Sequence, residues 1–270
     1  PVKSDLTALP DPPRNSAVLL IHYFGYINNA TELLRKESGN HFYLIEDASH
    51  VFLNEGFLNE CENQFVFFSS RKYGPTILGG WCNINLDLVD PEKDIEVLVW
   101  KSLAARFIKG LYMNAKDSEI DLSREKHYLK LFRDTDRLLD SKNYLSKLPQ
   151  NILKIIDCLK WEEISIRRRK NWHTLHALIG DKVDSFSNYL PDKSVPLGYL
   201  IHLNNRDMVR KKLATQRIFA PVHWTLPNQV KIKEHTDSRI LSDSLLTLPI
   251  DQRYGTTDMN YIADKLKGVI

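Results

Sequence analysis

Two short apolar segments, each followed directly by polar side chains, constrain the fold of this chain more than any other feature. Residues 42–45 (FYLI) and 65–68 (FVFF) are continuously apolar rather than alternating, which is typical of strands buried on both faces of a parallel sheet. An earlier apolar segment, residues 17–23, precedes a helix-forming stretch at 29–36. This strand–helix–strand order predicts an α/β fold with a mostly parallel central sheet.

The residues that follow the two apolar segments carry reactive groups. Asp47 and His50 come after the first segment, and Ser69 and Lys72 after the second. Ligands of open α/β sheets bind outside the carboxyl ends of the strands, so we expect these four side chains to meet at one edge. A carboxylate, an imidazole, a hydroxyl and an amine suit pyridoxal 5'-phosphate, which needs an amine for its aldehyde, an acid for its ring nitrogen and donors for its phosphate.

On this interpretation Lys72 is the catalytic residue and also belongs to the cofactor-binding set, with Asp47, His50 and Ser69. Asp47 keeps the ring nitrogen protonated, so that the ring withdraws electrons, and His50 faces or hydrogen-bonds the ring. Ser69 and the backbone donors of the following turn hold the phosphate. We expect burial to lower the pKa of the Lys72 amine and so make it a usable nucleophile.

The segments EDASH and SSRKYGPTILGG resemble the DegT/DnrJ/EryC1/StrS family of fold-type-I, pyridoxal-phosphate-dependent sugar aminotransferases. The positions that match in the second segment are Ser69, Arg71, Lys72, Gly79 and Gly80. The similarity extends to HYFG, RRRKNW, PVHW and LPIDQRY, in the order of the family. It therefore runs through nearly the whole chain.

The resemblance implies an aminotransferase that moves an amino group from glutamate or glutamine to a nucleotide-linked keto sugar, in a homodimer. It implies a cofactor-binding large domain over residues 1–150. Residues 151–270 then supply a bridging helix and a small α/β C-terminal domain, from which His223 could approach the substrate. Core packing is the alternative role for His223, and His22 likewise either faces the cofactor or shapes the turn after its strand.

Two departures from the family pattern support a different function. Leu78 stands where the family usually has Asp, and the chain opens at Pro1 where the family is already well into its large domain. The resemblance implies that a preceding segment would carry the first helices, early strands and a turn that completes the phosphate site. These departures favour a catalytically inactive binding or scaffold protein on an aminotransferase fold. A sugar dehydratase is disfavoured, because such family members replace the lysine with histidine and this chain keeps Lys72.

The remaining periodicity predicts largely helical structure over residues 91–148 and one long helix over 151–178. Its basic run at 167–170 is either a solvated helix face or a contact for an anionic group. The elements expected after it are strands at 197–203, 218–224 and 245–250 and helices at 207–214, 238–244 and 257–266.

Composition narrows the class of protein further. The 270 residues carry a net charge of only +3, which argues against a dedicated nucleic-acid binder. No apolar run is long enough to span a bilayer, and no cluster of metal ligands stands out among the nine histidines. Three cysteines without CxxC spacing are typical of a reduced, cytoplasmic protein.

Overall fold

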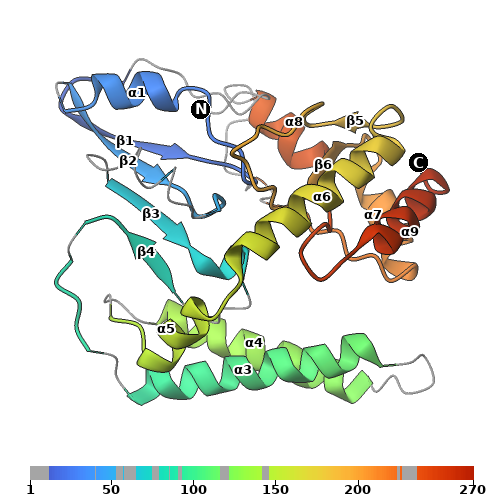
Figure 1. Ribbon diagram of the computed structural model, residues 1–270, viewed down its shortest axis with the longest axis horizontal. Helices are drawn as coiled ribbons and strands as arrows, with labels where there is room; N and C mark the ends of the chain where they lie inside the picture. Colours follow the sequence, from blue (N-terminus) through green and yellow to red (C-terminus); the bar gives the residue numbers. More distant parts are fainter. Residues whose placement is uncertain are drawn as a thin grey trace. The chain divides into compact units, whose positions relative to one another are not determined.

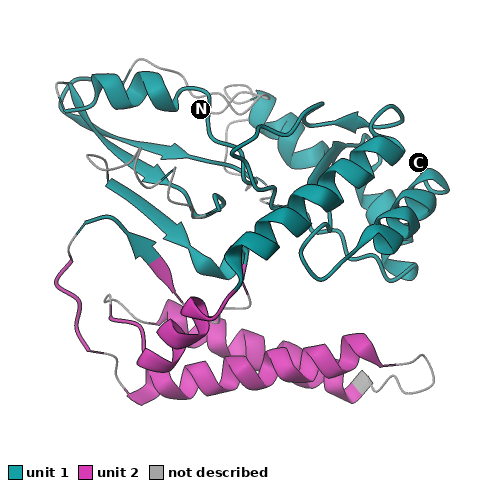
Figure 2. Cartoon of the chain, in the orientation of Figure 1, with its two compact units in different colours: residues 1–73, 81–84, 160–270 teal, residues 74–80, 85–159 magenta. Residues whose placement is uncertain are grey.

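The computed structural model describes residues 12–39, 41–52, 57, 65–74, 79–84, 86–90, 93–115, 122–141, 146–223, 226 and 236–270. Strands and helices alternate in an α/β arrangement (Figure 1). The chain divides into two compact units (Figure 2). The first comprises Pro1–Tyr73, Trp81–Ile84 and Lys160–Ile270, and the second Gly74–Gly80 and Asn85–Leu159. The expected division of the chain near residue 150 stays a prediction.

The first sheet contains the two apolar segments that dominate the sequence. Its strands are β1 (Ser16–Ile21), β2 (Phe42–Asp47), β3 (Phe65–Ser69) and β4 (Gly80–Cys82), in the order β1-β2-β3-β4. Helix α1 (Thr31–Glu37) connects β1 to β2. Since β1 pairs in parallel with β2, and β2 with β3, the predicted parallel arrangement is confirmed and the carboxyl ends of three strands lie at one edge.

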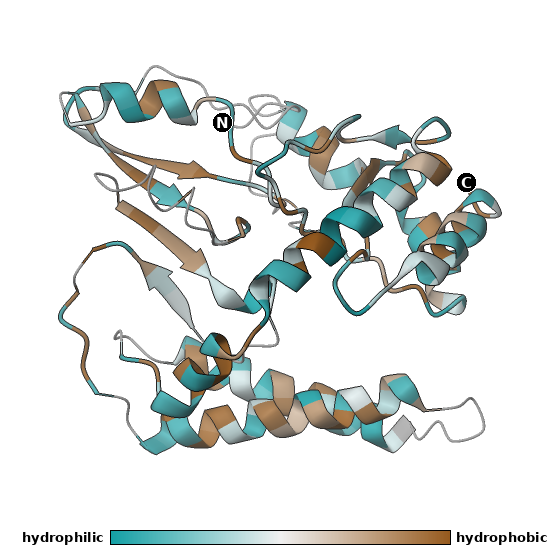
Figure 3. Cartoon of the chain, in the orientation of Figure 1, coloured by the Kyte–Doolittle hydropathy of each residue, from teal (hydrophilic) through white to brown (hydrophobic). Residues whose placement is uncertain are grey.

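The expectation that these strands are buried on both faces is wrong for the described residues. Burial alternates along β2, where Phe42 and Leu44 are buried while Tyr43 is 75% exposed. The buried face packs against Leu34 of α1 and Leu20 of β1. Figure 3 shows the apolar character of β1 and β3. Because α1 covers only one face, a continuously apolar strand is here half-buried.

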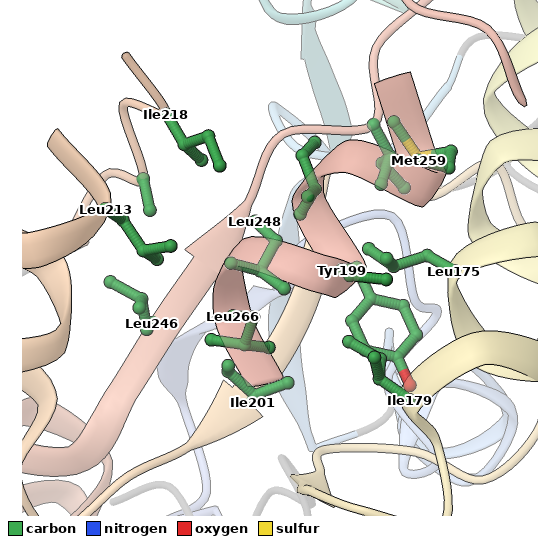
Figure 4. Close-up of a cluster of buried hydrophobic side chains, with 14 of the residues drawn as sticks. Leu175, Ile179, Tyr199, Ile201, Leu213, Ile218, Leu246, Leu248, Met259 and Leu266 are labelled. Atoms are coloured by element: carbon green, nitrogen blue, oxygen red, sulfur yellow. The ribbon is translucent and has the colours of Figure 1, made fainter. Parts of the chain in front are cut away.

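The C-terminal part of the first unit builds a second sheet from β5 (Asp184–Ser185), β6 (Tyr199–His202) and β7 (Leu245–Leu248), which are antiparallel. Its helices are α6 (Trp161–Ile179), α7 (Arg206–Thr215), α8 (Thr236–Ser244) and α9 (Thr256–Lys267). Apolar side chains from α6, β6, α7, β7 and α9 form one core, with Leu175, Tyr199 and Leu248 buried in it (Figure 4). The predicted alternation of strands and helices is thus found, with two exceptions.

The first exception is the expected strand at 218–224, because residues 218–223 form no strand. Pro221 lacks an N–H group and cannot donate to a ladder, although its carbonyl accepts a hydrogen bond from Thr247 N at 3.2 Å. Trp224 lies outside the described residues.

The second exception is the long helix expected at 151–178. The structure has two helices instead, α5 (Gln150–Asp157) and α6, separated by residues 158–160. The apolar spacing continues across this break, which is why the sequence pattern alone did not reveal it.

The second unit is helical, in agreement with the prediction for residues 91–148. Helices α3 (Lys93–Asn114) and α4 (Leu122–Asp140) pack against each other, and α5 adds apolar side chains to their common core. The core contains Ile95, Leu98, Val99 and Ile152. None of the helices in the described residues is both long and apolar enough to cross a membrane.

The C-terminal core provides a test of the fold. Leu248 is 0% exposed, so Leu248→Ala should lower the free energy of unfolding by about 2–5 kcal/mol through lost burial and a residual cavity. Met208→Ala, at a 41% exposed position of α7, is the matched control and should change it by less than about 0.5 kcal/mol. Urea unfolding followed by tryptophan fluorescence measures both. Equal effects would contradict the assigned core.

Candidate active site

The carboxyl ends of β1, β2 and β3 bring several of the predicted side chains to one cavity. His22, Asp47, His50 and Lys72 line it together with Ile21 and Ser49, and its volume is about 250 Å³. Lys72 ends the 3₁₀ turn η1 (Ser70–Lys72), which directly follows β3. Three of the residues predicted for the cofactor site, Asp47, His50 and Lys72, therefore lie around one space.

A buried ion pair fixes the ends of β1 and β2 behind this cavity. Arg35 donates to both carboxylate oxygens of Glu46, from Nε at 2.7 Å and Nη2 at 2.8 Å. His22 Nε2 lies 2.9 Å from Glu46 Oε2, and His22 Nδ1 accepts from Asn28 N at 3.1 Å, which places the ring proton on Nε2. Burial acts to raise the pKa of Glu46, but the bonds from His22 and Arg35 outweigh it and hold the pKa below its ordinary value. His22 thus holds the loop after β1 as well as lining the cavity.

Asp47 presents its carboxylate at the end of β2. Its Oδ1 accepts a hydrogen bond from Ser49 N at 2.9 Å, which closes a tight turn and orients the side chain. Burial raises the pKa of Tyr23, and the negative charge of Asp47 raises it further. The field of this carboxylate therefore extends to the loop after β1.

His50 is a buried, neutral imidazole that lines the cavity together with the acid and the amine. Its Nδ1 accepts a hydrogen bond from Phe24 N at 3.3 Å. Burial lowers the pKa of His50 to about 4, helped by the positive charges of Lys72 and His223 and opposed by Asp47. At pH 7 the ring is therefore uncharged, which suits it to pack on an aromatic ligand rather than to bind an anion.

Lys72 and His223 complete the electrostatics of the cavity. Burial lowers the pKa of Lys72, and neighbouring Arg71 lowers it further, while Asp47 opposes both. The direction is the predicted one, although the side chain remains exposed. The His223 ring lies 6.0 Å from that of His50 and 5.3 Å from that of Phe24, centroid to centroid. His223 thus approaches the site from the C-terminal part of the chain and packs there as well.

A network that the sequence reasoning missed fixes the residue after Lys72. The buried hydroxyl of Tyr73 shares its proton between His50 O at 2.7 Å and Val195 O at 2.8 Å. Gln252 Nε2 donates to Tyr73 O at 2.7 Å, and Arg168 Nε donates to Gln252 Oε1 at 2.8 Å. Arg168 lies in the motif RRRKNW and Gln252 in LPIDQRY. The similarity of these motifs to the family pointed to both segments, but it did not indicate that they form this network.

Two arginines of the basic run at 167–170 form neither a solvated helix face nor a contact for an anionic group, the two roles predicted for the run. Arg168 is only 4% exposed and donates from Nη1 to the carbonyls of Pro196 and Leu197, at 3.2 and 3.1 Å. Its guanidinium also lies 4.8 Å from the Tyr73 ring centroid. Arg169 donates to the carbonyl of Pro191 at 2.8 Å. These arginines hold loops of their own chain together.

The other predicted site residues are placed less directly. Ser69 is the half-buried last residue of β3, and the hydroxyl that lines the cavity is that of Ser49. The phosphate role of Ser69 stays a prediction, and Leu78 lies outside the described residues. Gly79 has a φ of 115°, a backbone conformation that favours glycine. Across the described part of the chain, no group of three or more His, Cys, Asp or Glu side chains is arranged to hold a metal ion.

Comparison of the fold with solved structures identifies its class. A DegT/DnrJ/EryC1/StrS aminotransferase from Brucella abortus superposes on 94% of this chain with a TM-score of 0.55 and 13% identity. A sugar aminotransferase from Streptococcus pneumoniae, in its pyridoxamine phosphate form, covers 94% of this chain with a TM-score of 0.59 and 12% identity. PseC of Helicobacter pylori, an aminotransferase of pseudoaminic acid biosynthesis, covers 94% of this chain with a TM-score of 0.57 and 15% identity. No family model and no curated protein matches the sequence.

The chain therefore has the fold of the pyridoxal-phosphate-dependent aminotransferases, and its expected fold class is confirmed. Within that class, the similar structures include a DegT/DnrJ/EryC1/StrS aminotransferase, a sugar aminotransferase and an aminotransferase of pseudoaminic acid biosynthesis. The chain spans 64% of the length of the Brucella structure, 69% of the Streptococcus structure and 66% of the Helicobacter structure.

The low pKa of His50 predicts a specific pH dependence. The unfolded chain takes up a proton at His50 near pH 6.5, but the folded protein only near pH 4. The unfolded state thus binds more protons between these values, so stability should fall as the pH drops through this window, by on the order of 3 kcal/mol. Urea unfolding at pH 7 and pH 4 should show a smaller loss for His50→Gln than for the wild type.

Exposed His41 supplies the control, because His41→Gln should retain the wild-type dependence on pH. An NMR titration of the wild-type ring is the direct check. A His50 imidazole that titrates near pH 6.5 in the folded protein would refute the assignment of a buried neutral ring.

Proposed function

We propose that this chain is a pyridoxal-phosphate-dependent aminotransferase that transfers an amino group from glutamate or glutamine to a nucleotide-linked keto sugar. One observation carries the proposal: Lys72 and Asp47 line the same cavity at the ends of neighbouring parallel strands, with neutral His50 beside them. The shared fold with sugar aminotransferases supports it. A lysine or an aspartate alone at a strand end would carry no such argument.

The residues of the cavity fit the cofactor. Its volume of about 250 Å³ is just under the usual range for ligand pockets, about 300–1,000 Å³, which suits one substituted ring. An amine, a carboxylate and an uncharged imidazole are the groups that the aldehyde, the ring nitrogen and the ring face require. Ser49 lines the cavity and Ser69 ends β3, and their hydroxyls would serve as donors to the phosphate.

When bound, pyridoxal phosphate would supply an electron-withdrawing ring that stabilises negative charge on the substrate carbon. Lys72 Nζ would hold the cofactor covalently and, once displaced by the amino donor, carry a proton between carbon atoms of the substrate and the cofactor. Its lowered pKa favours the neutral amine that this role needs. Asp47 would keep the proton on the ring nitrogen, in an orientation that its bond from Ser49 N maintains.

The remaining assignments rest on the resemblance of the motifs. The nucleotide link of the substrate, the amino-acid donor and the homodimer follow the family pattern, and a cytoplasmic location agrees with the cysteine usage. A catalytically inactive binding protein on the same fold is the competing function. The two differ in whether the protein holds the cofactor covalently.

Replacement of Lys72 tests the covalent role. Lys72→Ala should abolish both turnover and the visible absorbance of the cofactor-loaded protein, because no other amine is placed to bond the aldehyde among the described cavity residues. Borohydride reduction followed by peptide mass spectrometry should find the cofactor on Lys72 in the wild type. Lys211→Ala, an exposed lysine of α7, should behave like the wild type. A wild-type protein that takes up no cofactor would instead support the scaffold function.

Replacement of Asp47 tests the ring-nitrogen role separately. Asp47→Asn keeps an oxygen to accept from Ser49 N but removes the charge that holds the ring proton. We expect cofactor binding within a few-fold of wild type and a loss in kcat of at least about 10²-fold, comparable to removal of one electrostatic partner in other enzymes. Absorbance titration and steady-state kinetics separate the two quantities. A kcat near the wild-type value would rule out this role for Asp47.

A further inference from the structure

A second cavity, lined by aromatic side chains, lies next to the cofactor site. Its volume is about 220 Å³, and Ile21 lines both cavities. Tyr23 also belongs to its lining and directly follows His22 of the cofactor site. Burial and the charge of Asp47 both raise the pKa of Tyr23. The two cavities are therefore neighbours at the end of β1.

The lining of this cavity has a distinctive chemistry. Tyr23, Tyr26, Phe186 and Tyr189 supply aromatic rings, and Asn29 and Ser187 supply an amide and a hydroxyl. No charged side chain occurs among the described residues that line it. Such a surface offers ring faces to apolar C–H groups and polar tips to hydroxyl groups, whereas a diphosphate would find no compensating positive charge there.

The aromatic side chains come from two segments that the fold holds in place. Tyr26 N donates to Tyr23 O at 2.9 Å, so both tyrosines belong to one turn after β1. Phe186 N donates to Leu200 O at 3.0 Å, and the Phe186 and Tyr26 rings meet edge to face at 5.8 Å. Tyr189 lies in the same loop and is 70% exposed. The cavity is thus largely preformed, with one exposed aromatic ring at its side.

We propose that this aromatic cavity binds the sugar ring of the substrate, a hexopyranose whose C–H face packs on Tyr189 and its aromatic neighbours. A pyranose combines an apolar face with a rim of hydroxyls, which matches the lining. The volume is below the usual range of about 300–1,000 Å³ for ligand pockets, so it accommodates a single ring. The inference rests on the proposed function, because the sugar carbon must reach Lys72 in the adjoining cavity.

The test is binding of unreactive nucleotide sugars to the full protein. The probes are UDP-glucose, dTDP-glucose and GDP-mannose, each compared with its free nucleoside diphosphate, and calorimetry measures the affinities. Tyr189→Ala should weaken binding of the preferred nucleotide sugar by about tenfold through loss of ring contact, with the affinity for the free diphosphate changed less than about twofold. Tyr189→Phe should retain binding, since it keeps the ring. Phe219→Ala, at an exposed aromatic residue outside the cavity, is the matched control.

Several results would overturn the inference. They are an unchanged nucleotide-sugar affinity in Tyr189→Ala, equal losses for the nucleotide sugar and its diphosphate, or failure of all three nucleotide sugars to bind the wild type. Saturation-transfer NMR should place the strongest contacts on the sugar protons. Cofactor absorbance, measured on the same samples, distinguishes the two proposals. Wild-type protein that binds sugar but no pyridoxal phosphate would contradict the proposed function alone, whereas normal cofactor binding with no effect of Tyr189→Ala would contradict only the sugar site.

Discussion

The candidate site depends on one network of hydrogen bonds around Tyr73, the residue after the candidate catalytic lysine. Its hydroxyl reaches Val195 O, 122 residues away in sequence, and its carbonyl accepts from Gln252, 179 residues away. The loop after β1 packs against this network at Gly25, where a Cβ atom would overlap the carbonyl oxygen of Val195. The φ of Gly25 is +95°, a backbone conformation that favours glycine. The C-terminal residues therefore determine where the amine at the end of β3 is held.

The buried carboxylate of Glu46 fixes the other side of the cavity. A fully buried charge is tolerated only when it is paired and hydrogen-bonded, and Glu46 has Arg35 and His22 as partners. Loss of one partner from such a pair usually costs roughly 3–5 kcal/mol, so the geometry of β1, α1 and β2 is strongly determined. Asp47 is the next residue of β2, so its backbone is held by the same contacts. Its carboxylate lines the cavity on the opposite face of the strand.

The sequence was sufficient for the local part of this arrangement. Apolar segments with polar ends predicted the parallel strands and the edge at which Asp47, His50 and Lys72 meet, because strand direction alone places those ends together. It could not predict the partners of Arg168, whose position in a basic run suggested solvent or an anion, because the accepting carbonyls are supplied by loops distant in sequence. The aromatic cavity could not be predicted for the same reason, because Tyr26 and Tyr189 lie in loops that are distant in sequence and adjacent only in the fold. The break before α6 and the missing strand at Pro221 show that periodicity does not determine where an element stops.

Placing the imidazole and the amine in one cavity beside Asp47 also explains the lowered pKa of His50 and of Lys72. Burial together with the positive charges of Lys72 and His223 lowers the pKa of His50 and leaves its ring uncharged at pH 7, although the charge of Asp47 acts in the opposite direction. The carboxylate retains a backbone donor from Ser49, while Nδ1 of His50 already accepts from Phe24 N and gains nothing there from a proton. The result is a carboxyl group that accepts a backbone hydrogen bond, an amine of lowered pKa and a neutral ring, all lining one cavity. This is a set of groups with which a heterocycle can be protonated at one end and covalently bonded at the other.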